Sequence, residues 1–94
     1  GDVFIKLHRI QKKKNMYYLS EIVVNSSQIS FLTENKEYKT ALNEGSMDIG
    51  LNTNAEFTDI VINIRGNSET ITVIGDIELV ESKINTGTKK LLRD

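Results

Sequence analysis

The stretch that decides the fold runs from Phe57 to Ile84 and reads FTDIVINIRGNSETITVIGDIELVESKI. Isoleucine occupies every second position in residues 60–64, which is the period of a strand with one favoured face. Residues 71–74 form a second β-branched run, and the polar residues between the two runs include a glycine that suits a turn. Apolar residues then recur at helical spacing behind Asp76, a typical helix N-cap. The stretch therefore predicts strand, turn, strand and helix.

The rest of the chain adds further strand candidates. They are residues 3–10, 16–25 and 29–33, a weaker run at 37–42, and an alternating run at 47–51. We therefore expect one domain over residues 1–94 with an α+β, β-rich fold. It would hold a small, mostly antiparallel sheet of about five or six strands with one short C-terminal helix. A loop-rich segment is expected at about 34–56, and the helix is expected to end at Asn85 or Gly87.

Composition excludes several classes of site and protein. Twelve isoleucines and six valines against two alanines favour strands over helices. The chain has no cysteine and one histidine, His8, so disulfides, thiolate metal sites and multi-histidine zinc sites within one chain are excluded. No apolar run approaches the roughly 20 residues that span a bilayer, and no signal peptide is visible. We expect a cytoplasmic protein without membrane insertion, and the Ile-, Asn- and Lys-rich composition favours a bacterial or bacteriophage origin.

Charge divides the chain into unlike parts. The formal charge is −1, yet residues 1–14 carry five basic side chains against one acid, and residues 15–63 carry seven acids against two lysines. A protein that binds polyanions with its whole surface should be basic overall, and this chain is not. The candidates for a local polyanion contact are the basic residues around the first turn, namely Arg9, Lys12, Lys13 and Lys14.

The acidic middle segment supplies a second set of candidates. Loops that are not committed to a core often hold the residues that contact a partner. The candidates for partner contact are Glu44, Met47, Asp48, Ile49 and Leu51. Near the other end, the sequence leaves two alternatives for Leu91 and Leu92: they dock on a neighbouring chain, or they are disordered.

No catalytic constellation is visible in the sequence. Phosphate-binding loops of the GxxxxGK[ST] and GxGxxG types, the GxSxG elbow and the HExxH pair are all absent. Glu78 and Glu81 would be neighbours on the predicted helix, on the side away from its apolar face. We therefore predict a protein that is not an enzyme and that has no cofactor and no metal.

Several segments, in this order, resemble the FlbD/SwrD-like family of small flagellar proteins. They are FIKLHRI at residues 4–10, YLSEIVVNSSQISFL at 18–32, TDIVINIRGNSETITV at 58–73, and Val80-Glu81-Ser82. The chain departs from the family pattern in its greater length, in the additional residues 34–56, and in His8-Arg9 where the family has threonine–arginine. The resemblance implies a non-enzymatic bacterial accessory protein that acts by contact, or a phage-borne relative.

These observations leave three functional hypotheses. The first is a non-enzymatic protein-interaction module that binds another protein through a sheet edge or through the acidic 34–56 segment. The second is a nucleic-acid-associated regulator that uses Arg9 and Lys12–Lys14. The third is a structural protein that assembles into a homo-oligomer through its edge strands or through Leu91 and Leu92.

Overall fold

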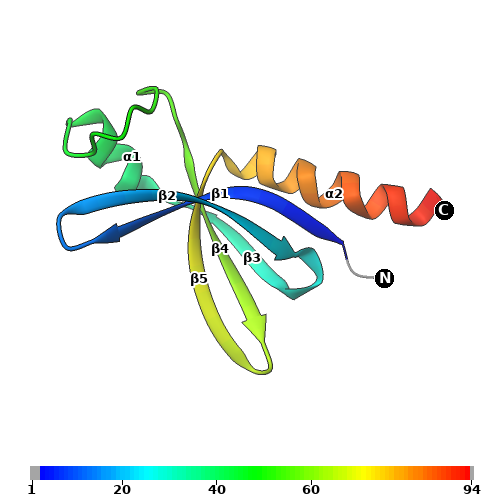
Figure 1. Cartoon of the computed structure of the whole chain (residues 1–94). Helices are drawn as coiled ribbons and strands as arrows, with labels where there is room; N and C mark the ends of the chain where they lie inside the picture. Colours follow the sequence, from blue (N-terminus) through cyan, green and yellow to red (C-terminus); the bar gives the residue numbers. More distant parts are fainter. Residues whose placement is uncertain (1–2, 94) are drawn as a thin grey trace.

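The computed structural model describes residues 3–93, and it describes side chains for residues 3–86. The elements follow in the order β1 (Phe4–Lys13), β2 (Met16–Asn25), η1 (Ser26–Gln28), β3 (Ile29–Glu34), α1 (Lys36–Asn43), β4 (Phe57–Ile64), β5 (Asn67–Ile74) and α2 (Ile77–Arg93). Figure 1 shows the strands as one sheet with the two α-helices at separate places on it. This arrangement confirms the predicted α+β, β-rich class with an antiparallel sheet.

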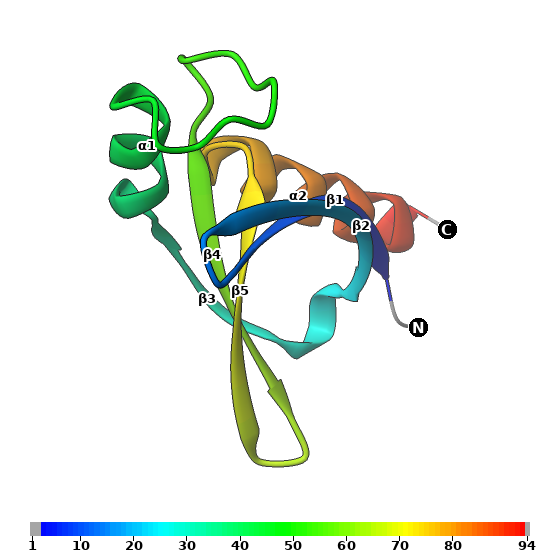
Figure 2. The ribbon, with the colours of Figure 1, turned by 60° about the vertical axis from the view of Figure 1, so that its left-hand side comes forward.

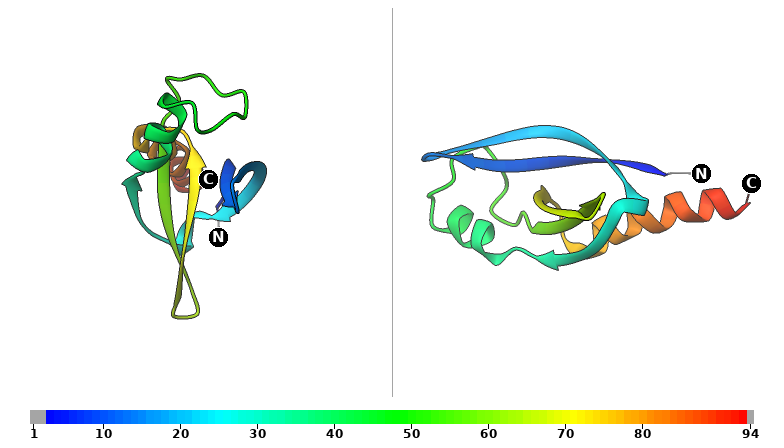
Figure 3. Two further views of the ribbon diagram at one scale, coloured as in Figure 1. Left: turned by 90° about the vertical axis from the view of Figure 1, so that its left-hand side faces the viewer. Right: turned by 90° about the horizontal axis from the view of Figure 1, so that it is seen from below.

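The five strands lie in the order β2-β1-β5-β4-β3, and every neighbouring pair is antiparallel. The two edge strands, β2 and β3, are consecutive in the chain and are joined only by η1. Because the strand direction reverses at each of the four neighbouring pairs, β2 and β3 run in the same direction. The connection through η1 is therefore not a hairpin, because the chain keeps its direction as it passes from one edge strand to the other. Figure 2 shows the chain curving along β2 and continuing through η1 into β3. In Figure 3 (left), β4 and β5 lie between the β1–β2 ribbon and β3.

Both faces of the sheet bury apolar side chains. Leu7 and Ile10 are both buried although they are three positions apart on β1, so they face opposite sides of the sheet. The first cluster contains Ile5, Leu7, Val24, Ile60, Ile62, Ile71, Val73 and Val80, of which Val80 comes from α2. The second contains Ile10, Leu42, Met47 and Phe57, of which Leu42 comes from α1. Each helix thus covers a different face.

The weaker strand predicted at 37–42 is wrong, because these residues belong to helix α1. Asn35 caps the helix, since its side-chain oxygen accepts a hydrogen bond from the Tyr38 backbone N–H at 3.0 Å. Tyr38, Ala41 and Leu42 are spaced i, i+3 and i+4 and pack together in the second cluster. The helical spacing of these apolar residues and the Asn35 cap account for a helix in place of the predicted strand.

Two further predictions are wrong, one about a strand and one about the end of a helix. The alternating run at 47–51 forms no strand, and Met47 is instead buried in the second cluster at 4% exposure. Gly45 and Gly50 both have positive φ, so the backbone turns on either side of Met47. Helix α2 does not end at Asn85 or Gly87 but continues to Arg93. The side chains of Leu91 and Leu92 lie outside the described residues.

The central stretch has the predicted form. β4 and β5 pair over their full length and are joined by Arg65 and Gly66, which have φ values of 52° and 84°. Two successive positive φ angles are the signature of a type I′ hairpin turn. The Asp76 carboxylate accepts a hydrogen bond from the Leu79 backbone N–H at 2.8 Å, which makes it the N-cap of α2.

Candidate functional site

Strand β2, at one edge of the sheet, exposes several large apolar side chains. Within residues 3–93, β2 pairs with β1 alone, and its ten residues carry one charged side chain, Glu21. Glu21 lies 3.8 Å from the Lys6 ammonium on β1. Four large apolar side chains of β2 are exposed, namely Met16 (61%), Tyr18 (46%), Leu19 (42%) and Val23 (57%). A long apolar edge of this kind is a template for pairing with another strand.

The opposite edge, β3, has the protection that β2 lacks. β3 is six residues long, and its register with β4 shifts between Ile29 and Phe31. Short strands and bulges are means by which sheets prevent pairing at their edges. The ten residues of β2 pair with β1 in an unbroken register and include no lysine, arginine or proline. Edge pairing is therefore favoured at β2.

The hairpin register shows which backbone groups of β2 face outward. Lys13 and Met16 flank a two-residue turn, so these two residues bond to each other, and bonded pairs alternate from there along the ladder. On that pattern Met16, Tyr18 and the following even-numbered residues of β2 turn their N–H and C=O groups toward β1. Tyr17, Leu19, Glu21 and Val23 turn theirs toward the free edge.

A groove lies beside the C-terminal half of β2. Its volume is about 200 Å³, and its lining includes Ile22, Val23 and Val24 from β2 together with Ile62, Ile64 and Ile71 from β4 and β5. Arg9 and Glu69 also line it, with 3.8 Å between a guanidinium nitrogen and a carboxylate oxygen. The Arg9 Nε atom is buried and has no hydrogen-bond partner among the residues whose side chains the structure describes. The groove is thus mainly apolar, with one weakly paired cation.

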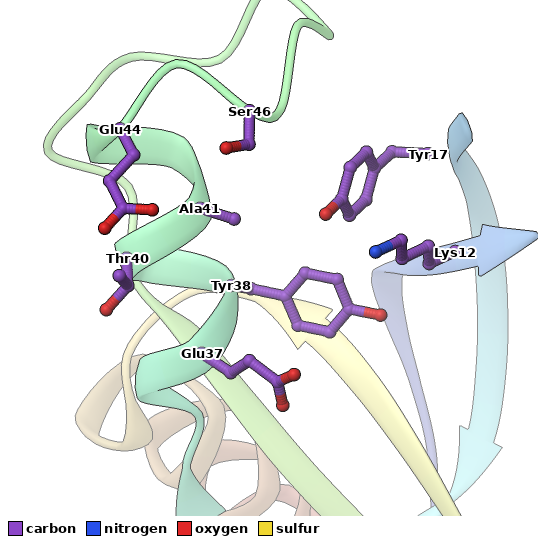
Figure 4. Close-up of a pocket in the computed structure, with 8 residues that line it drawn as sticks. All are labelled: Lys12, Tyr17, Glu37, Tyr38, Thr40, Ala41, Glu44 and Ser46. Carbon is purple, nitrogen blue, oxygen red and sulfur yellow. The ribbon is translucent and has the colours of Figure 1, made fainter. Parts of the chain in front are cut away.

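A larger pocket of about 550 Å³ separates the β1–β2 hairpin from α1 (Figure 4). Lys12 and Tyr17 enter it from the hairpin, and Tyr38 reaches toward them from α1. The rings of Tyr17 and Tyr38 meet edge to face at 5.9 Å, and Tyr38 also contacts the Phe57 ring at 5.7 Å. The remaining lining residues are Glu37, Thr40, Ala41, Glu44 and Ser46.

The Tyr38 hydroxyl in this pocket has a raised pKa. Burial raises the pKa of the Tyr38 hydroxyl, and the nearby Tyr17, Glu37 and Asp59 raise that pKa further. A phenol with a raised pKa stays protonated at neutral pH and donates a hydrogen bond instead of acting as a base. Asp59 itself accepts hydrogen bonds from Thr72 Oγ1 at 2.7 Å and from Asn35 Nδ2 at 3.0 Å.

The predicted basic residues do not form one surface. Arg9 points into the groove, whereas the Lys12 ammonium lies 5.5 Å from the centre of the Tyr17 ring in the pocket on the other side of the sheet. Lys13 and Lys14 are exposed at the turn, where Lys14 adopts a positive φ of 58°. Within the described part of the chain, neither of these two lysines forms an ion pair.

The predicted partner-contact residues separate in a similar way. Met47 is buried, and Ile49 and Leu51 are half-buried against the second cluster, so these three side chains stabilise the fold. Glu44 and Asp48 are exposed. The sequence indicated the two strands of the first hairpin, but it did not indicate that β2 would lie at an edge. That property depends on the pairing of β1 with β5, which no local pattern encodes.

No group of three or more histidine or acidic side chains within residues 3–86 has a geometry that would hold a metal ion. The part of the chain that the structure describes contains no helix long and apolar enough to cross a membrane. No protein-family model, curated protein or solved structure matches this chain. Membership of the FlbD/SwrD-like family therefore stays a prediction.

Proposed function

We propose that this protein is a non-enzymatic interaction module that binds an extended segment of another protein as an additional strand on β2. One observation carries the proposal: the ten-residue strand β2 is mostly apolar and, among residues 3–93, pairs in an unbroken register with β1 alone, while the opposite edge strand is short and bulged. Strand addition uses main-chain hydrogen bonds for affinity and alternate side-chain contacts for specificity. We keep the bacterial or phage origin and the cytoplasmic location as part of the proposal, supported by composition and by the absence of cysteine.

Strand addition has more support than nucleic-acid binding. Polyanion binding needs several cations on one continuous surface. Arg9 faces the groove, and the pocket that holds Lys12 also contains Glu37 and Glu44. Carboxylates beside a lysine oppose a phosphate backbone, so the basic first turn is a weak candidate for that role.

The test uses a matched pair of substitutions at Val23. Val23→Pro removes a backbone N–H that faces the free edge, at a position where an edge strand tolerates proline. Val23→Thr keeps the N–H group and the β-branched shape. Peptides selected from a random library on the wild-type protein should bind the Thr variant within about threefold of wild type, and the Pro variant at least about tenfold more weakly.

Hydrogen exchange on the same peptide complexes gives an independent readout. The amides of Tyr17, Leu19, Glu21 and Val23 should exchange quickly in the free protein and slowly in the complex, in alternation with amides that are already protected. Peptides that bind both Val23 variants equally, or that protect α1 in place of β2, would refute strand addition. A concentration-dependent dimer that the Pro substitution abolishes would instead assign the edge to a second copy of the chain.

A further inference from the structure

We infer that the segment that binds β2 has two unlike halves: apolar residues alternate in the half beside the groove, and acidic residues occupy the half beside the Lys13–Lys14 turn. This inference rests on the proposed function and adds the chemistry of the partner. It follows from the two ends of β2, which present different surfaces to any strand laid along the edge.

The groove sets the apolar half. It adjoins β2 only at Ile22, Val23, Val24 and Asn25, and its opposite wall includes the exposed Ile64 side chain. Successive side chains of an added strand point to opposite faces of the sheet, so every second one would enter the groove. Most of the remaining lining is isoleucine and valine beside the Arg9–Glu69 pair, so burial of an apolar side chain is favoured there, and a volume of about 200 Å³ accommodates side chains of the size of valine or isoleucine.

The turn sets the acidic half. Lys13 and Lys14 have no ion-pair partner among residues 3–86, and Lys12 beside them is held over the Tyr17 ring. A strand rises about 3.3 Å per residue, so the turn and Ile22 lie roughly 20–25 Å apart along β2. That distance exceeds the Debye length of about 8 Å at physiological salt. The lysines therefore attract acidic residues at the near end of the added strand and have little effect at the groove.

Charge argues against a second copy of this chain as the occupant. An antiparallel β2–β2 pair would place the lysine turn of one copy beside Asn25 and η1 of the other, where the sequence is Asn-Ser-Ser-Gln. A parallel pair would place the two lysine turns side by side. Neither arrangement offers a carboxylate to Lys13 or Lys14, so complementarity requires a different protein.

The experiment measures the affinity of the full chain for fluorescein-labelled ten-residue peptides. One half of each peptide alternates glutamate with threonine, the other half alternates valine with threonine, and both orders are made to cover both strand directions. The control peptides carry lysine in place of glutamate. In low salt the better glutamate peptide should bind about tenfold more tightly than its lysine counterpart, and the ratio should fall toward one at about 0.5 M salt.

Two protein variants separate the inference from the proposal beneath it. Lys13→Gln with Lys14→Asn removes both charges and suits the positive φ at residue 14, so it should abolish the difference between the peptides without changing the melting temperature. Val23→Pro should abolish binding of both peptides. If the glutamate and lysine peptides bind equally and Val23→Pro abolishes binding of both, the inference of two unlike halves is wrong, whereas strand addition is still supported. Binding that survives Val23→Pro, or the absence of any binding, would overturn strand addition itself.

Discussion

Asn35 joins helix α1 to the sheet through three hydrogen bonds, and each is expected to respond differently to substitution. Its side-chain oxygen accepts from the Tyr38 N–H at 3.0 Å, and its Nδ2 donates to the Asp59 carboxylate at 3.0 Å. Its backbone N–H donates to the Phe57 carbonyl at 2.9 Å, and every substitution except proline keeps that bond. The side chain therefore contributes a helix cap and a bond to a charged acceptor.

The two contributions can be separated by two substitutions at residue 35. Loss of an N-cap costs about 1 kcal/mol. A hydrogen bond to a charged group contributes about 1.5–3 kcal/mol, and partial exposure of this bond to water reduces its value to about 1 kcal/mol. Asn35→Ala loses both contributions and should lower the free energy of unfolding by about 2 kcal/mol. Asn35→Ser keeps a capping oxygen and should lose about 1 kcal/mol.

Urea denaturation followed by circular dichroism measures both free energies. Asn43→Ala is the matched control, since Asn43 is exposed at the other end of α1 and should change stability by less than about 0.5 kcal/mol. At about 0.05–0.15 kcal/mol per residue the domain stays folded in all three variants. Equal losses for the Ala and Ser variants would show that Asn35 acts only through Asp59, and a loss below about 0.5 kcal/mol for Ala would refute the reasoning.

Three further predictions concern other parts of the structure. Met47→Ala should lower the free energy of unfolding by about 2–4 kcal/mol, because Met47 is buried in the second cluster. The control Asp48→Ala should change that free energy by less than about 0.5 kcal/mol. A Met47→Ala effect as small as the control would contradict the burial of Met47. The pKa of Tyr38 is raised in the folded protein above its usual 10.0, so the unfolded chain loses this proton first and stability should fall as pH rises above about 10. Tyr38→Phe should remove that part of the fall in a pH series. Arg9→Met removes a buried Nε without a partner and a weak contact to Glu69, so the melting temperature should stay level or rise, and a clear drop would show that the ion pair stabilises the fold.

Local sequence patterns were enough to predict the five strands that form and the two hairpins, but they also predicted strands at 37–42 and 47–51 that do not form. These signals are local in the sequence. The isoleucine alternation in residues 60–64 is followed directly by the turn residues Arg65 and Gly66, and Asp76 caps the helix that begins at the next residue. At residues 37–42 the predicted strand is wrong, although Asn35, Lys36 and Glu37 form a helix-start signal in which an acid follows the capping residue in the first turn. The capping residue was a better guide there than the apolar period, because six residues complete fewer than two helical turns.

The candidate site was not predictable in the same way, because it depends on pairing between distant residues. Lys12 lines the pocket and Arg9 the groove only because β1 lies between β2 and β5 in a specific register. Met47 looked like a loop residue because glycine, asparagine and isolated apolar residues surround it in the sequence. Its burial follows from α1, which was itself predicted as a strand.

The free edge of β2 is a consequence of the topology and not of any one side chain. β2 and β3 run in the same direction, so direct pairing between them would be parallel. Parallel neighbours need a crossover connection of about a dozen residues or more, and η1 supplies three, Ser26–Gln28. The chain therefore cannot cover the edge of β2 with β3 without breaking the existing ladder. Meanwhile, within the described residues, β1 and β5 share only the register pairs Arg9–Val73 and Ile10–Thr72, and the β1–β2 ribbon diverges from β4 and β5 (Figure 2). The groove is lined by residues of both parts. The free edge of β2 and the groove thus both follow from the strand order. A segment that pairs with the C-terminal half of β2 would therefore also lie beside the groove.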